Sequence, residues 1–281
     1  MIAPNKVVRR VFLLRHIPRN FLSHLLSMTP KRKFRNKGSK VLIIVHAHWA
    51  EELIYIVNRI NFLKMDVDLI LTTTLNEYQE KLGNIEKLSS NHNVSIYIVE
   101  NIGRDVLPFL HVLKGFDLSA YSLVIKLHTK RSQKIWYRTL IDFHLDSTKR
   151  VEKQIRIANI DPLSLIGHPL LSYPIHSVHQ QYLKRGVENF LGPLDTREMR
   201  GAAFTAGTMF SFHPSYFENI SEKLDRIGVE DFPLELNYSE YTMAHILERV
   251  FGVNAFTQGA KIRSIYLRDF LNIKAMFIRI N

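Results

Sequence analysis

The feature that most constrains the fold is a regular alternation of apolar, β-branched runs with segments of helical periodicity. Residues 41–45 (VLIIV) form a continuous apolar run, as expected for a strand buried on both faces. Similar runs follow at residues 67–73, 94–99 and 121–127. Helical patterns lie between and after them, at residues 51–64, 75–90, 108–114, 133–143 and 151–159. The alternation predicts an α/β fold with a mostly parallel sheet flanked by helices.

Polar side chains follow each of these predicted strands. In parallel sheets, ligands bind beyond the carboxyl ends of the strands. The polar residues at those positions are His46 and His48, Thr72 and Thr73, Asn101 and Gly103 to Asp105, and His128 to Lys130. Together they predict a site for an anionic, hydroxyl-rich ligand.

The segment 101–110 (NIGRDVLPFL) is the strongest local feature. Gly103 permits a tight turn, and Pro108 is tolerated in the first turn of the helix that follows. Asp105 either hydrogen-bonds a sugar hydroxyl or caps the helix. Arg104 either pairs with a phosphate or neutralises Asp105.

The segment 126–132 (KLHTKRS) is the second feature. If the strand continues, alternation places Lys126, His128 and Lys130 on one face. Three cations side by side are costly unless an anion or a carboxylate lies opposite. A nucleotide diphosphate would supply that charge, and the alternative is a solvated strand end.

Beyond residue 161 the pattern becomes richer in loops. A strand region is predicted at residues 203–212, and helices are predicted at residues 214–224 and 239–251, the last ended by Gly252. Carboxylates that suit a general base gather late in the chain: Glu230, Asp231, Glu235, Glu240 and Glu248.

The net charge of +12 belongs to the two ends of the chain. Residues 1–40 hold eleven Lys and Arg and no acid, residues 261–281 carry a net +4, and residues 41–260 carry a net −3. The body therefore lacks the basic stripe of a nucleic-acid-binding protein. The absence of cysteine excludes a disulfide scaffold, a thiolate zinc site and a cysteine nucleophile.

The basic N-terminal segment is also apolar, and its arginines and Pro18 exclude a membrane-spanning helix. It predicts an interfacial helix on an anionic membrane surface, or alternatively a solvated extension that packs on the body. The expected organisation is a basic amphipathic extension (1–38), a main domain (39–260, with halves 39–160 and 161–260) and a basic tail (261–281). The expected location is the cytoplasmic face of a membrane, peripherally bound.

Five sequence blocks together resemble the rhamnan synthesis protein F family. They are residues 101–110, 126–132, 205–214, 231–233 and 242–252, in the family's order, and the resemblance covers roughly residues 40–255. The resemblance implies a bacterial glycosyltransferase that builds a rhamnose-containing or related surface polysaccharide. It implies a nucleotide-sugar donor, with dTDP-L-rhamnose as the best guess, and a lipid-linked glycan as acceptor.

The order of the blocks also resembles inverting glycosyltransferases of the GT-A fold. Those enzymes place an Asp-x-Asp metal motif after the fourth strand, where this chain has Lys126 to Lys130. A divalent metal, Mg or Mn, is therefore in doubt. Cationic side chains would take over the stabilisation of the departing diphosphate.

The resemblance and the motif chemistry assign roles to individual residues. Glu240 is the preferred base, with Asp231 second. The residues expected to bind the donor are His46, Asn101, Gly103, Arg104, Asp105, Lys126, His128 and Lys130. The residues expected on the acceptor side are Thr205, Gly207, Thr208, Met209 and His245.

Two alternatives remain at this point. One is a non-catalytic glycan- or nucleotide-binding module of a polysaccharide synthesis complex. The other is a metal hydrolase that uses His46 and His48, which would hold stoichiometric metal.

Overall fold

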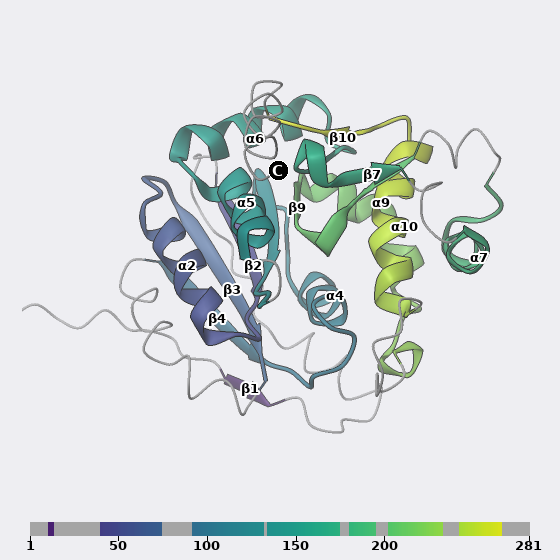
Figure 1. Cartoon of the computed structure of the whole chain (residues 1–281), viewed down its shortest axis with the longest axis horizontal. Helices are drawn as coiled ribbons and strands as arrows, with labels where there is room; N and C mark the ends of the chain where they lie inside the picture. The colour runs from purple at the N-terminus through teal and green to yellow at the C-terminus, as the bar shows by residue number, and fades with distance from the viewer. Residues whose placement is uncertain are drawn as a thin grey trace, which may run out of the picture.

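The computed structural model describes residues 11–13, 40–74, 92–131, 134–174, 180–194, 202–232 and 242–265. These residues form one eight-stranded sheet with helices on both faces, and a separate two-stranded sheet (Figure 1). In spatial order the larger sheet consists of β1 (Val11–Leu13), β4 (Asn93–Ile98), β3 (Val67–Thr73), β2 (Val41–His46), β5 (Leu123–His128), β9 (Phe210–Phe212), β6 (Leu165–Ile166) and β10 (Ile262–Arg263). The smaller sheet pairs β7 (Ser172–Pro174) with β8 (Ala203–Thr205). The expected α/β class with a mostly parallel sheet is confirmed.

Helices cover both faces of the larger sheet because its central strands are apolar on both sides. In β2, Val41, Ile43 and Val45 face one core, and Leu42 and Ile44 face the other. The helices of the first face are α2 (Ala50–Asn61), α5 (Lys134–Leu145) and α6 (Thr148–Ile160). Those of the second are α4 (Val106–Gly115), α7 (Gln180–Leu191), α9 (Pro214–Leu224) and α10 (Met243–Thr257), and Figure 1 shows α10 on the side away from α2.

The strand order reverses between β2 and β5. The chain runs outward from β2 through β3 to β4, then returns through α4 and places β5 on the other side of β2. His46 and His128, the last residues of β2 and β5, are paired in register. Such a reversal opens a crevice at the carboxyl ends of the strands, where α/β proteins bind their ligands.

Among the described strands of the larger sheet, only β9 runs antiparallel to its neighbours β5 and β6. Because Phe210 is paired with Lys126, the chain enters β9 at the carboxyl edge of β5. The short 3-10 turn before it, Ala206–Thr208, is thereby brought to the same crevice.

The prediction that Gly252 ends the last helix is wrong, because α10 continues through it to Thr257. At Gly252 the helix packs directly on the backbone of β8, and an added Cβ would overlap the carbonyl oxygen of Ala203. The glycine serves this close approach of helix and strand.

The two ends of the chain each contribute a strand to the sheet. Val11–Leu13, within the segment expected to be an interfacial helix, instead form a strand parallel to β4, where β-branched and aromatic residues extend an open sheet edge. Ile262–Arg263, within the expected basic tail, pair with β6. The predicted helix at residues 75–90 and the remainder of both ends lie outside the described residues. None of the helices that the structure describes is long and apolar enough to cross a bilayer.

Replacing Gly252 by alanine should lower the free energy of unfolding by about 1–3 kcal/mol, because the new methyl group would have to displace backbone. The matched control is Gly186→Ala in α7, where the atoms nearest an added Cβ belong to the Ile246 side chain and not to backbone. Chemical denaturation measures both. An equal loss in the two variants would contradict the account of Gly252.

Candidate functional site

A cleft of about 440 Å³ lies at the crevice between the carboxyl ends of β2 and β5. Its walls come from the ends of these two strands, the loop before α4, the turn before β9 and the first turns of α10. The lining residues are His46, His48, Trp49, Asn101, Arg104, Asp105, Val106, His128, Thr129, Lys130, Gly207, Thr208, Ala244, His245 and Glu248.

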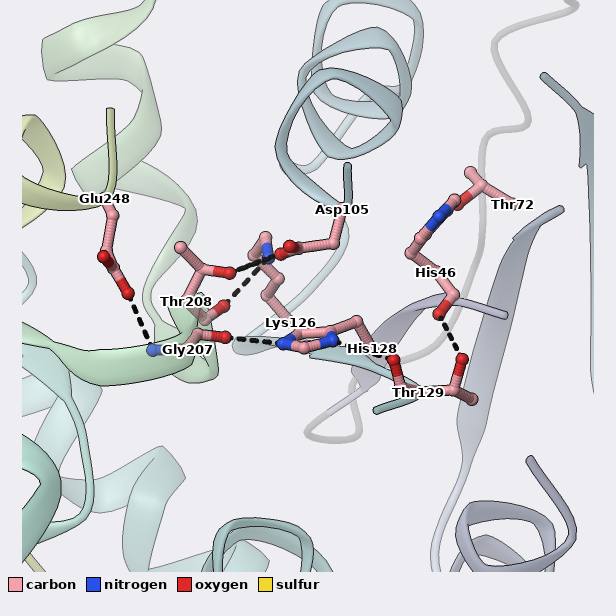
Figure 2. Close-up of polar contacts among 9 residues, drawn as sticks. All are labelled: His46, Thr72, Asp105, Lys126, His128, Thr129, Gly207, Thr208 and Glu248. Carbon is pink, nitrogen blue, oxygen red and sulfur yellow. Dashed lines mark hydrogen bonds and ion pairs between the residues drawn. The ribbon is translucent and has the colours of Figure 1, made fainter. Parts of the chain in front are cut away.

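A buried ion pair between Lys126 and Asp105 forms the floor of the cleft (Figure 2). Lys126 is only 1% exposed, and its Nζ also donates to the carbonyl oxygen of Thr208 at 2.9 Å and to Thr208 Oγ1 at 3.0 Å. Thr208 Oγ1 in turn donates to Asp105. Lys126 thus uses its three donors within the protein and lies beneath the cleft rather than in it.

Asp105 is held as a carboxylate by these contacts. Burial alone would raise its pKa, but His128, Lys126 and the hydrogen bonds from Lys126 and Thr208 together hold that pKa well below its usual range. Burial lowers the pKa of Lys126, and Asp105 opposes that effect. The sequence predicts that Lys126, His128 and Lys130 need an anion or a carboxylate opposite them. Asp105 of the same chain supplies that carboxylate.

Glu248 and His128 approach the turn Ala206–Thr208 from opposite sides (Figure 2). The Gly207 N–H donates to Glu248 Oε1, and His128 Nε2 donates to the Gly207 carbonyl oxygen, each at 2.7 Å. Gly207 (φ 76°) and Thr208 (φ 52°) are both left-handed. That conformation is strained for threonine and persists only where surrounding contacts fix it, as Lys126 and Asp105 do here.

A second left-handed pair, Gly103 (φ 67°) and Arg104 (φ 55°), precedes α4. Gly103 is required there, because an added Cβ would overlap Leu107. The turn directs Arg104 across the cleft, where its Nη1 donates to His245 Nε2 on α10 at 3.2 Å. The cleft is therefore closed on one side by a guanidinium.

Burial acts against the charged form of two histidines at the carboxyl edge, His46 and His128. Burial lowers the pKa of His46 to about 3, and its Nδ1 lies 3.0 Å from Thr72 Oγ1. Burial also lowers the pKa of His128. The positive charges at the cleft wall are therefore Arg104 and Lys130, and the Lys130 ammonium lies 4.3 Å from the ring centre of Trp136.

Glu248 is a mostly buried carboxylate of the cleft, one of the possible bases named from the sequence but ranked behind Glu240 and Asp231. Its side chain is 11% exposed, pairs with Arg249 and has a pKa raised by burial. A signal for it was present in the sequence, because Glu248 lies one helical turn after His245 in the predicted last helix and so on the same face.

The structure brings most of the predicted donor and acceptor residues together. His46, Asn101, Arg104, Asp105, His128, Lys130, Gly207, Thr208 and His245 line the cleft, and Lys126 lies below it. Gly103 shapes the turn before Arg104, and Thr205 and Met209 are buried beside the turn that holds Gly207.

The two predicted bases are not among the cleft residues that the structure describes. Asp231 lies in a separate cavity beside α7 and α9, where its Oδ2 accepts from the Gly228 N–H at 2.7 Å. Glu240 lies outside the described residues.

The donor set of the cleft does not fit a divalent metal ion. No group of three or more His, Asp and Glu side chains in the described part of the chain is arranged to hold one. Asp105 Oδ2 is taken by Lys126 and Thr208, and His46 Nδ1 by Thr72, so each of these residues has a single atom left for a ligand.

Replacing Asp105 by asparagine should lower the free energy of unfolding by about 3–5 kcal/mol near neutral pH, because Lys126 loses its counter-ion while buried. Since the pKa of Asp105 is depressed below its ordinary value of 3.8, the pair stabilises the fold above that pH and less below it. The variant should therefore be less sensitive to acid in denaturation curves. The double variant Asp105→Asn/Lys126→Met is the control and should recover part of the loss.

Comparison with known proteins gives two concordant results. A sequence profile of the rhamnan synthesis protein F family matches residues 5–156, more than half of the chain. The chain is also 26% identical over 234 residues to the uncharacterized protein WxcX from two strains of Xanthomonas campestris pv. campestris. That alignment covers 79% of this chain and 32% of each relative, so the chain spans about a third of their length. On the family match, which includes both the Arg104 turn and the Lys126 strand, the chain belongs to the rhamnan synthesis protein F family.

Proposed function

We propose that this chain is a glycosyltransferase domain of polysaccharide synthesis. It would move a sugar from a nucleotide-sugar to a hydroxyl of a lipid-linked glycan, with inversion at the anomeric carbon. The observation that carries the proposal is the cleft at the reversal between β2 and β5, which combines two cations, a buried glutamate and several neutral hydrogen-bonding groups. Membership of the rhamnan synthesis protein F family supports L-rhamnose, carried by dTDP, as the first donor to test.

Arg104 and Lys130 are assigned to the donor diphosphate. They come from two segments of the cleft wall, one before α4 and one after β5, and both charges border the same cavity. A pair of fixed cations stabilises the charge that develops as the bond from the sugar to the diphosphate breaks. Because the donor set does not fit a divalent ion, we assign this task to the side chains alone.

Neutral groups of the cleft would orient the sugar and the nucleoside. Asn101 and His46 offer hydrogen bonds without charge, and the Asp105 carboxylate keeps lone pairs for a hydroxyl on its second oxygen. His128 supports the cleft instead, because its ring nitrogens are bonded to the Thr129 and Gly207 carbonyl oxygens. Lys126 takes a supporting role, because it fixes Asp105 and the Thr208 carbonyl from below.

Glu248 and Glu240 are the two candidates for the base. The base takes the proton of the acceptor hydroxyl, the acceptor oxygen attacks the anomeric carbon, and the nucleoside diphosphate leaves with the electrons of the broken bond. Glu248 is supported by its place in the cleft and by its raised pKa, which suits proton abstraction near neutral pH. Glu240 is supported by its place two residues before the block 242–252 that resembles the family.

A GT-A-like arrangement, with residues 39–160 on the donor side and residues 161–260 on the acceptor side, belongs to this proposal. It is supported by the mostly parallel sheet and by the turn before β9, which reaches the cleft from the second half. The basic ends of the chain would hold it to an anionic membrane at the cytoplasmic face.

Glu248→Gln and Glu240→Gln identify the base. The variant that lacks the base should lose about 10²–10⁴-fold in kcat. Its affinity for the nucleotide-sugar should persist, because the amide is isosteric. Transfer to a lipid-linked acceptor and calorimetry with the donor measure the two properties. Near-normal turnover in both variants would remove both residues from the mechanism.

The same assay separates the proposal from its alternative. If the unsubstituted chain binds nucleotides tightly but transfers no sugar from any of several donors, it is a non-catalytic binding module.

If Glu248 is the base, the rate should fall as the pH drops through its pKa, because only the carboxylate accepts the proton. Burial raises that pKa, so the acid limb of kcat/KM should lie above the ordinary glutamate value of 4.5. The pH profile of the unsubstituted chain measures this limb, and Glu240→Gln serves as the control that should leave its position unchanged. An acid limb at or below pH 4.5 would contradict the role of Glu248.

A further inference from the structure

Exposed apolar side chains gather at the mouth of the cleft. Trp49, directly before α2, is 36% exposed, Ile54 on α2 is 43% exposed, and Ile135 in the first turn of α5 is 66% exposed. Helices α2 and α5 lie side by side on the same face of the sheet, joined by the hydrogen bond from Tyr137 to the Glu52 carbonyl oxygen. Both helices begin at the carboxyl edge, because each follows its strand directly.

Exposed cations are interleaved with these apolar side chains. The Arg131 guanidinium lies 5.3 Å from the ring centre of Trp49, and the Arg138 guanidinium lies 4.9 Å from that of Tyr55 on α2. Lys134 is exposed one residue before Ile135. The acidic side chain exposed in the first turn of α2 is Glu51, so the cations prevail.

We propose that this rim, defined as Trp49, Ile54, Arg131, Lys134, Ile135 and Arg138, docks onto an anionic phospholipid bilayer. The apolar side chains would enter the interface between headgroups and acyl chains, where tryptophan is favoured. The cations would pair with the phosphates of the headgroups. Apolar insertion together with electrostatic attraction is the combination that holds interfacial surfaces on membranes.

The opposite edge of the sheet is the surface that competes with the rim. Phe62 and Ile160 there are 73% and 83% exposed, more than any apolar side chain of the rim. Two of the neighbouring cations are paired with carboxylates, Arg150 with Asp146 and Arg263 with Asp161. Lys149 and Arg156 on α6 are exposed, so this edge is basic as well, and it differs from the rim in holding no tryptophan and in lying away from the cleft.

The proposal of a docking surface rests on these exposed side chains and their contacts, and it does not require the proposed transfer reaction. If that reaction holds, docking would turn the mouth of the cleft toward the bilayer, because Trp49 belongs to both the rim and the cleft. An acceptor carried on a lipid would then meet the cleft without leaving the membrane. The docking surface consists of residues other than those of the basic N-terminal extension.

Tryptophan fluorescence tests the proposal directly, because both tryptophans of the chain, Trp49 and Trp136, lie here. In Trp136→Phe, the full chain carries Trp49 as its one fluorophore. Phosphatidylglycerol–phosphatidylcholine vesicles with brominated acyl chains should quench Trp49, and vesicles of brominated phosphatidylcholine alone should not. If the chain sediments with the anionic vesicles while Trp49 stays unquenched, the basic ends alone bind the membrane and the proposal fails.

Substitution provides the second test. Lys134→Glu/Ile135→Asp should lower partitioning of the full chain onto the anionic vesicles by about tenfold or more. The matched control, Lys153→Glu/Ile160→Asp on α6, should leave it nearly unchanged. Circular dichroism verifies that both variants fold. Equal losses in the two variants would show a general effect of charge and overturn the assignment of the rim. Sugar transfer to a soluble acceptor, measured alongside, keeps this outcome separate from the failure of the proposed function.

Discussion

The ion pair between Lys126 and Asp105 organises the centre of this protein. Lys126 stands on β5 and Asp105 stands before α4, while Thr208, which contacts both, precedes β9. One charged contact therefore ties together three segments that lie far apart in the sequence. Because the pair is buried, neither partner can be lost without leaving a charge in a medium that solvates it poorly. The left-handed turns on either side are tolerated because these contacts determine their conformation.

The sequence predicted the strands well because their apolar runs are long, β-branched and bounded by polar residues. It also predicted the clustering of Arg104, His128 and Lys130, since parallel strands end at a common edge. It could not predict the strand order or the reversed direction of β9, because three-residue strands carry little periodicity. Gly252 was misread for a related reason: a glycine that ends a helix and a glycine that lets a helix touch a strand look the same in a sequence.

Burial and pairing within the chain decide which groups of the cleft remain available to a ligand. A histidine is a possible cation in the sequence, but burial can make it neutral. His46 is an example, with a pKa of about 3. The lysine that appeared best placed to bind an anion, Lys126, is already satisfied by the chain. What remains for a ligand is Arg104 and Lys130 on the walls, together with Glu248 on α10. The surroundings of each residue, more than its type, decide its role.

The reversed strand β9 has a consequence for how this fold can diversify. Although it belongs to the second half of the chain, β9 lies between β5 and β6 and pairs with both. Exchanging the second half for that of a relative would therefore replace an interior strand of the sheet as well as one wall of the cleft. Recombination at this boundary would disturb the core. New specificities are more accessible by point substitution at the cleft-lining positions of the first turns of α10, where a change leaves the sheet intact.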